Sequence, residues 1–210
     1  MTMLSRLSSG IEARARRARA LLEDRRGVAA VEFAFVVPVL LCMYFITMEA
    51  SQGIEVNKKV SRMGSAVADL ITQQSAITKA EVVAIMQIGG AIIQPYDRSQ
   101  PTLDVTAIQL GTEATPVARV AWSLKLNSSG NPVAVAAKGD IVTDSQLNRI
   151  RAPGAFYIRV RSSLNYEPVV TWNGDATSMG LLTAFNDIGM GETFYLRPRI
   201  SQKIPCDDCP

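Results

Sequence analysis

Histidine is absent from the 210 residues of the chain, and cysteine occurs only three times. The lack of histidine excludes Ser-His-Asp and Cys-His nucleophilic sites and every metal site that uses imidazole ligands. The chain also lacks a glycine-rich phosphate loop of the Walker or dinucleotide type, because its glycines have the wrong neighbours and spacing. These absences argue against an enzyme, and we expect neither a metal nor a cofactor.

Positive charge is concentrated near the N-terminus. Residues 1–27 contain seven arginines and three acidic residues, which gives this segment a net charge of +4. The whole chain carries a formal net charge of +3, so residues 28–210 together carry −1. A nucleic-acid-binding domain would present a basic face, and this nearly neutral remainder therefore argues against nucleic acid as a partner.

A long apolar run follows the basic segment. Glu32 is the only charged residue within residues 28–48. With a rise of about 1.5 Å per residue, a helix over this run would be roughly 30 Å long, enough to cross the hydrocarbon core of a membrane. Buried helices of soluble proteins are usually shorter, and a secretory signal peptide has a shorter apolar region that ends in a small-x-small site. The run therefore predicts a single membrane span.

The charges around the span predict its orientation and single out one residue. Cytoplasmic flanks of membrane helices are enriched in arginine, so we expect residues 1–27 in the cytoplasm and the bulk of the chain across the membrane. A carboxylate such as Glu32 inside a span costs about 2.5–3.5 kcal/mol on insertion scales and by default indicates a function. The structural alternative is a carboxylate in the first helical turn, which the helix dipole would stabilise.

The residues around Gly27 resemble a type IV prepilin processing site. A basic leader precedes this glycine, an apolar helix follows it, and Glu32 is the fifth residue after it. The wider segment, residues 25–41, is similar to the N-terminus of the TadE/TadG family of minor pseudopilins from the tight-adherence (Tad, or Flp) pilus system. The segment has the glycine, the Ala-Val-Glu-Phe core and the proline followed by two leucines at matching places.

The resemblance implies cleavage between Gly27 and Val28 by a prepilin peptidase at the cytoplasmic face. It also implies that Glu32 pairs with the new α-amine of a neighbouring subunit, since a buried carboxylate beside a buried ammonium costs far less than either alone. The implied partners are the peptidase, other major or minor pilins, the inner-membrane Tad assembly platform and membrane lipid. We expect Pro38 to kink the helix by removing a backbone hydrogen bond, although a span also tolerates a proline.

The remaining residues predict an α+β fold. The helical pattern continues over residues 49–75, and a second, shorter helix begins at a capping box formed by Thr78 and Glu81. Beyond this helix, alternating apolar residues predict strands at residues 103–110, 117–126, 155–164 and 192–200. Helices followed by strands indicate a small antiparallel sheet, so residues 76–210 would form a periplasmic α+β domain.

Four arginines alternate with apolar residues in the last two expected strands, so each pair should share one strand face: Arg159, Arg161, Arg197 and Arg199. Such a face could be a cationic binding strip. The solvated outer side of a half-buried sheet is the interpretation that the pattern favours.

The C-terminal Cys206 and Cys209 form a C-x-x-C pair, which could be redox-active, half of a zinc site or a structural disulfide. Zinc would need two further ligands, and the outer part of the chain has no other cysteine and no histidine. A disulfide is favoured because compartments outside the cytoplasm are oxidising, and it would fix the tail beside the last strand. Cys42 lies within the span, where we expect an inert apolar residue.

These features predict a minor pseudopilin of a Tad-type pilus assembly and secretion system that packs into or primes the pilus through its N-terminal helix. It would occupy the inner membrane with its outer domain in the periplasm, and would later join an extracellular pilus. The alternative is an unprocessed single-span inner-membrane scaffold or binding protein, and an anchored enzyme ranks third. A mature N-terminus at Val28 would separate the first hypothesis from the second.

Overall fold

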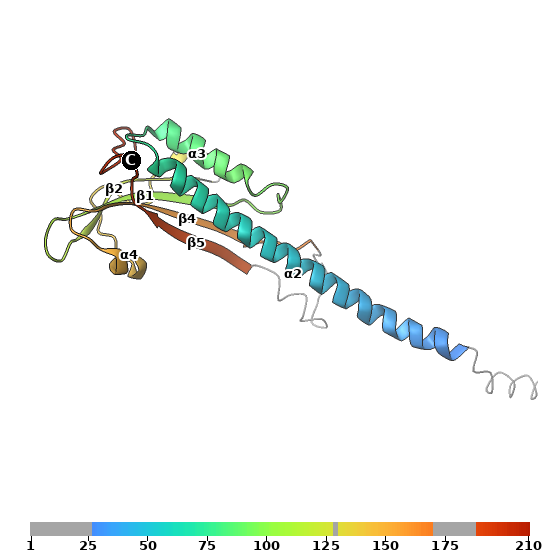
Figure 1. Cartoon of the computed structure of the whole chain (residues 1–210). Helices are drawn as coiled ribbons and strands as arrows, with labels where there is room; N and C mark the ends of the chain where they lie inside the picture. Colours follow the sequence, from blue (N-terminus) through green and yellow to red (C-terminus); the bar gives the residue numbers. More distant parts are fainter. Residues whose placement is uncertain (1–26, 128–129, 170–187) are drawn as a thin grey trace, which may run out of the picture. The chain divides into compact units, whose positions relative to one another are not determined.

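The computed structural model describes residues 27–127, 130–169 and 188–210 (Figure 1). The chain divides after Met48 into two compact units, which are considered separately. Helix α2 (Val28–Thr72) begins directly after Gly27, and its first 21 residues belong to the first unit. None of residues 28–48 is buried.

The second unit is built on a five-stranded sheet with the strand order β3-β2-β1-β4-β5, in which every pairing is antiparallel. A long N-terminal helix, a shorter helix and an antiparallel sheet are the α+β fold that the sequence predicts. The strands are β1 (Thr102–Leu110), β2 (Ala118–Leu126), β3 (Pro132–Val133), β4 (Phe156–Tyr166) and β5 (Ile188–Leu196).

One face of the sheet is covered by the C-terminal part of α2 and by α3 (Lys79–Ala91) (Figure 1). The Thr78 side chain accepts a hydrogen bond from the Glu81 N–H, and the Glu81 carboxylate accepts one from the Thr78 N–H, so the expected capping box is confirmed. The apolar stripes of both helices meet the inward residues of the central strands in the larger core, which includes Val60, Met63, Val67, Ile71, Val82, Val105, Leu124, Ile158 and Val160.

Two glycines allow these helices to pack closely. A Cβ added at Gly64 of α2 would lie 2.7 Å from Ser162 Oγ on β4 and 2.9 Å from the Phe194 ring on β5. A Cβ at Gly89 of α3 would lie 2.5 Å from the Val67 side chain on α2. Real Cβ contacts are longer than these distances, so the packing requires glycine at both positions.

The opposite face of the sheet carries a smaller core under α4 (Ser145–Ile150) and the segment before it. Asp144 caps α4 by accepting a hydrogen bond of 2.9 Å from the Gln146 N–H. The Tyr195 hydroxyl donates a second bond of 2.5 Å to the same carboxylate, which ties α4 to β5. Neither α4 nor β3 is expected from the sequence, because six and two residues are too short to show a periodic pattern.

The last strand differs from the expected residues 192–200. It begins at Ile188, where β5 extends its pairing along the end of the long strand β4, and it ends at Leu196. Pro198 has no N–H for a strand ladder and is consistent with this early end. Arg197 and Arg199 therefore lie beyond the sheet, and the expectation that they share a strand face is wrong.

Candidate functional site

The residues of the expected processing site lie at the start of α2. Gly27 and Val28 are exposed, and so is Glu32. Glu32 is the fifth helical residue, and the first turn contains no acidic residue. The alternative of a first-turn carboxylate is therefore wrong, because the helix begins at Val28 and places Glu32 one turn further in. No hydrogen bond or ion pair joins Glu32 to another residue within the described ranges.

Helix α2 is long and apolar enough to cross a membrane, and it is the one such helix in the described part of the chain. The most apolar stretch of 18 residues in this helix has a mean hydropathy of 2.3, and none of these residues is buried. Cys42 is an exposed free thiol in this region. The helix continues through Pro38, where the expected kink stays a prediction. An exposed apolar helix of this length fits a single-span membrane anchor.

The second unit opens with a buried carboxylate, Glu49, which is 3% exposed. The Tyr166 hydroxyl donates a hydrogen bond of 2.5 Å to it, and the Val169 N–H donates to both carboxylate oxygens at 3.1 and 3.2 Å. Tyr166 stacks on Tyr96 with ring centroids 5.8 Å apart, and the Arg98 guanidinium lies over both rings. Burial and the contact with Glu49 raise the pKa of Tyr166 above its usual value, so the hydroxyl remains a donor.

This cluster fastens the beginning of the second unit to the end of β4 and to the loop after α3. Sequence reasoning did not single out Glu49. The sequence does place this acidic residue directly after an apolar run. An acidic side chain at such a position must either face water or find buried partners.

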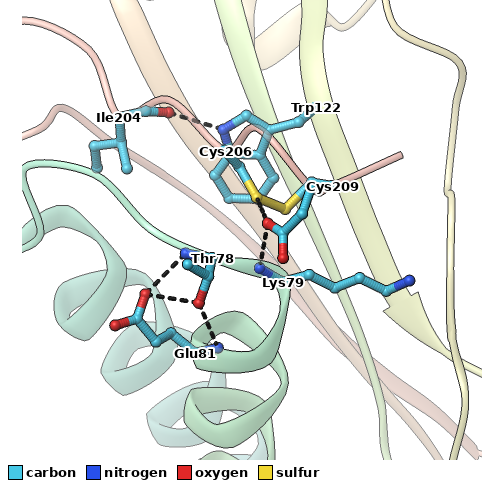
Figure 2. Close-up of a disulfide and its surroundings, with 8 residues drawn as sticks. Thr78, Lys79, Glu81, Trp122, Ile204, Cys206 and Cys209 are labelled. Carbon is cyan, nitrogen blue, oxygen red and sulfur yellow. Dashed lines mark hydrogen bonds between the residues drawn. A yellow bond between two sulfur atoms is a disulfide. The ribbon is translucent and has the colours of Figure 1, made fainter.

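The C-terminal tail contains a disulfide between Cys206 and Cys209 (Figure 2). The residues just before the disulfide bind β2 and the turn between α2 and α3. The Trp122 indole N–H donates to the Ile204 carbonyl at 2.8 Å, and the Ile77 N–H donates to the Pro205 carbonyl at 3.1 Å. The expectation that the tail lies beside the last strand is therefore wrong, because its hydrogen bonds within the described residues go to β2, to this turn and to the adjoining ends of α2 and α3.

Arg199 accounts for the path of the tail. Its N–H donates to the Thr72 carbonyl at 2.9 Å, and its guanidinium pairs with Asp69 at 2.6 Å. Both partners lie in the last turn of α2, so the chain that leaves β5 is led across the end of this helix toward the α2–α3 turn. The sequence offers no signal for this crossing, because the two segments are far apart along the chain.

The donor atoms around the C-x-x-C pair can be compared with what a zinc ion requires. Donor atoms of Cys206, Asp208 and Cys209 lie within 4.8 Å of one another. Zinc uses cysteine as a thiolate and takes four ligands. Here the two sulfur atoms are bonded to each other, and Asp208 is the one further donor that joins them within the described residues.

The four arginines that alternate with apolar residues in the sequence have separate surroundings. Arg159 donates to the Thr106 hydroxyl at 3.2 Å, and Arg197 donates to the Tyr157 hydroxyl at 2.7 Å while lying over the Tyr157 ring. Arg199 pairs with Asp69. Of these four arginines, Arg161 is the one that is exposed and has no partner among the described residues. This arrangement does not support a cationic binding strip.

Comparison with known proteins finds one similarity, over the N-terminal helix. The family model of the TadE-like protein matches residues 27–68. The match begins at Gly27 and includes Glu32, Pro38 and most of α2. No curated protein and no solved structure matches the chain. Residues 27–68 therefore match the TadE-like family, as the sequence resemblance predicts.

Proposed function

We propose that this protein is a minor pseudopilin of a Tad-type pilus assembly and secretion system. The observation that carries the proposal is a TadE-like match that starts at Gly27 and runs into an apolar helix with no buried residue among residues 28–48. A soluble domain would cover so large an apolar surface. In a pilin the same surface contacts lipid before assembly and the helices of neighbouring subunits afterwards.

The first step is cleavage between Gly27 and Val28 by a prepilin peptidase at the cytoplasmic face of the inner membrane. Packing among the described residues does not require a glycine at this position, because a Cβ added to Gly27 would meet no atom within 4 Å. Its backbone does not occupy the left-handed region either. A peptidase that binds an extended chain would favour this residue, since glycine has no side chain to exclude.

The second step is assembly directed by Glu32. Cleavage would turn Val28 into an N-terminal ammonium one helical turn before this carboxylate. Both charges are costly in lipid, and a neighbouring subunit can supply the missing partner for each. The mature protein would then join other pilins at the inner-membrane assembly platform, with its second unit in the periplasm. The protein would act through packing and charge pairing, without catalysis.

Replacement of Glu32 by glutamine tests this assembly step. Glu32→Gln should still be cleaved and inserted, but it should fail to co-purify with partner pilins and should reduce piliation, because an unpaired ammonium in lipid costs several kcal/mol. Glu55→Gln is the matched control, since Glu55 lies on the exposed side of the same helix and, within the described residues, pairs with Lys59 alone. Normal filaments assembled with Glu32→Gln would remove the central contact of the proposal.

A further inference from the structure

The contacts of the tail fall into two groups, separated by Cys206. The contacts before this cysteine involve Ile204, whose side chain is fully buried, and Pro205. Their carbonyls accept hydrogen bonds from the Trp122 indole and from the Ile77 N–H. Because these residues precede the disulfide, their docking does not depend on the loop that the disulfide closes.

The contacts after Cys206 depend on the disulfide loop. Asp208, which lies inside the loop, accepts a hydrogen bond of 2.8 Å from the backbone N–H of Lys79, the first residue of α3. Pro210, just beyond the loop, accepts one of 3.2 Å from the Ser123 N–H on β2. Asp208 also contacts the Cys206 sulfur at 3.3 Å, and this is no hydrogen bond in the oxidised state because a disulfide sulfur carries no proton.

Asp208 completes the N-terminus of α3. The first N–H groups of a helix lack partners within the helix, and the capping box of Thr78 and Glu81 leaves the Lys79 N–H to be satisfied from outside. Asp208 supplies that acceptor, although it brings a second carboxylate close to Glu81 and opposes the lowering of the Glu81 pKa by the Thr78 hydrogen bonds.

We propose that the Cys206–Cys209 disulfide is a redox latch for the N-terminus of α3. In the oxidised state the short loop holds Asp208 against the Lys79 N–H. Reduction releases residues 207–210 and leaves Ile204 and Pro205 docked. The latch thus couples the redox state of two tail sulfurs to the first turn of a helix that is distant in sequence.

The latch closes by thiol–disulfide exchange with an oxidant that itself carries a disulfide. Cys209 is partly exposed whereas Cys206 is only 8% exposed, so the Cys209 thiolate attacks the oxidant, forms a mixed disulfide and displaces one oxidant sulfur. The Cys206 thiolate then attacks the Cys209 sulfur and displaces the second one. The two protons lost by the cysteines are taken up by the two released thiols. This reaction requires an oxidising compartment. The location of the tail in such a compartment rests on the proposed function, whereas the latch itself does not.

Hydrogen exchange of the purified full-length chain in detergent tests the latch directly. Addition of dithiothreitol should lower the protection of the Lys79 amide about 2- to 30-fold, the equivalent of the roughly 0.5–2 kcal/mol that a capping acceptor contributes. The Ser123 amide should lose protection with it, while the Ile77 amide stays protected as an internal control. Unchanged protection at Lys79, or equal loss at Ile77 and Lys79, would each overturn the proposal of a local latch.

A matched pair of variants tests the reverse coupling. If the disulfide favours docking of Asp208, docking must favour the disulfide by the same factor. Asp208→Ala should therefore shift the equilibrium with dithiothreitol toward the reduced form by that same 2- to 30-fold, whereas Asp207→Ala should not, because the exposed Asp207 side chain has no partner among the described residues. Equal equilibrium constants for the two variants would contradict the coupling. Both measurements are made on purified protein, so they are independent of cleavage at Gly27.

Discussion

Adding a single methyl group to Gly64 should destabilise the protein, although alanine is a better helix former than glycine. The new Cβ would lie 2.7 Å from Ser162 Oγ and 2.9 Å from the Phe194 ring. Ser162 is fully buried on β4, so both its hydroxyl and the Phe194 ring must give way to the new methyl group. Gly53→Ala in the same helix is the matched control, because the nearest atoms to its Cβ lie at 3.8 and 4.0 Å, which is ordinary contact.

The expected magnitudes follow from two opposing contributions. Both substitutions gain up to about 1 kcal/mol of helix propensity. Only Gly64→Ala incurs overpacking, which typically costs about 1–3 kcal/mol. We therefore expect Gly53→Ala to be neutral or more stable than the parent protein, and Gly64→Ala to be less stable than Gly53→Ala by about 1–3 kcal/mol. The propensity contribution is the same for both substitutions and cancels in the difference between their free energies of unfolding.

Urea unfolding of the full-length chain in detergent, followed by tryptophan fluorescence, measures this difference from the two midpoints at a common slope. Equal midpoints would show that the sheet accepts the extra methyl group and would refute the close-packing explanation for Gly64.

Two further predictions concern buried and capping carboxylates. Glu49→Leu should lower the free energy of unfolding by about 1–3 kcal/mol, because the buried Tyr166 hydroxyl loses its acceptor. Adding Tyr166→Phe to this variant should recover part of the lost stability. If the two substitutions instead lower the stability additively, the pairing is contradicted. Asp144→Ala should cost about 0.5–2 kcal/mol near neutral pH through loss of the α4 cap. Hydrogen bonding by Tyr195 lowers the pKa of Asp144 in the folded protein. The ionised Asp144 therefore stabilises the fold above its pKa in the unfolded chain, about 4, and this stabilisation is lost as the pH falls through its lower pKa in the folded protein. The urea midpoints of the parent protein and of Asp144→Ala should therefore converge as the pH is lowered. A difference between the two midpoints that stays constant with pH would argue against this linkage.

The features that the sequence predicts well are those that depend on neighbouring residues. The apolar run ahead of Met48, the capping box at Thr78 and the alternation along β1, β2 and β4 each carry a local signal, and the structure places these helices and strands close to the expected residues. The TadE-like match over residues 27–68 is likewise contiguous, which is why the resemblance is visible without a structure.

The features that could not be predicted depend on contacts between distant segments. Glu49 is buried because Tyr166 and the Val169 N–H, far along the chain, supply its hydrogen bonds. The tail docks on β2 because Arg199 binds the end of α2 and redirects the chain. Gly64 looks like a weak point in a helix until the sheet that packs against it is known. In each case the partner lies more than 90 residues away or on another layer of the fold, where sequence pattern carries no information.

The most direct test of the proposed function is the identity of the N-terminal residue of the mature protein. The protein recovered from the membranes and the sheared pili of its native host should begin at Val28, and a variant with a bulky residue in place of Gly27 should accumulate as an uncleaved precursor. An intact leader on the membrane-extracted protein, or normal trimming of the Gly27 variant, would contradict prepilin processing and would favour a permanently anchored inner-membrane scaffold.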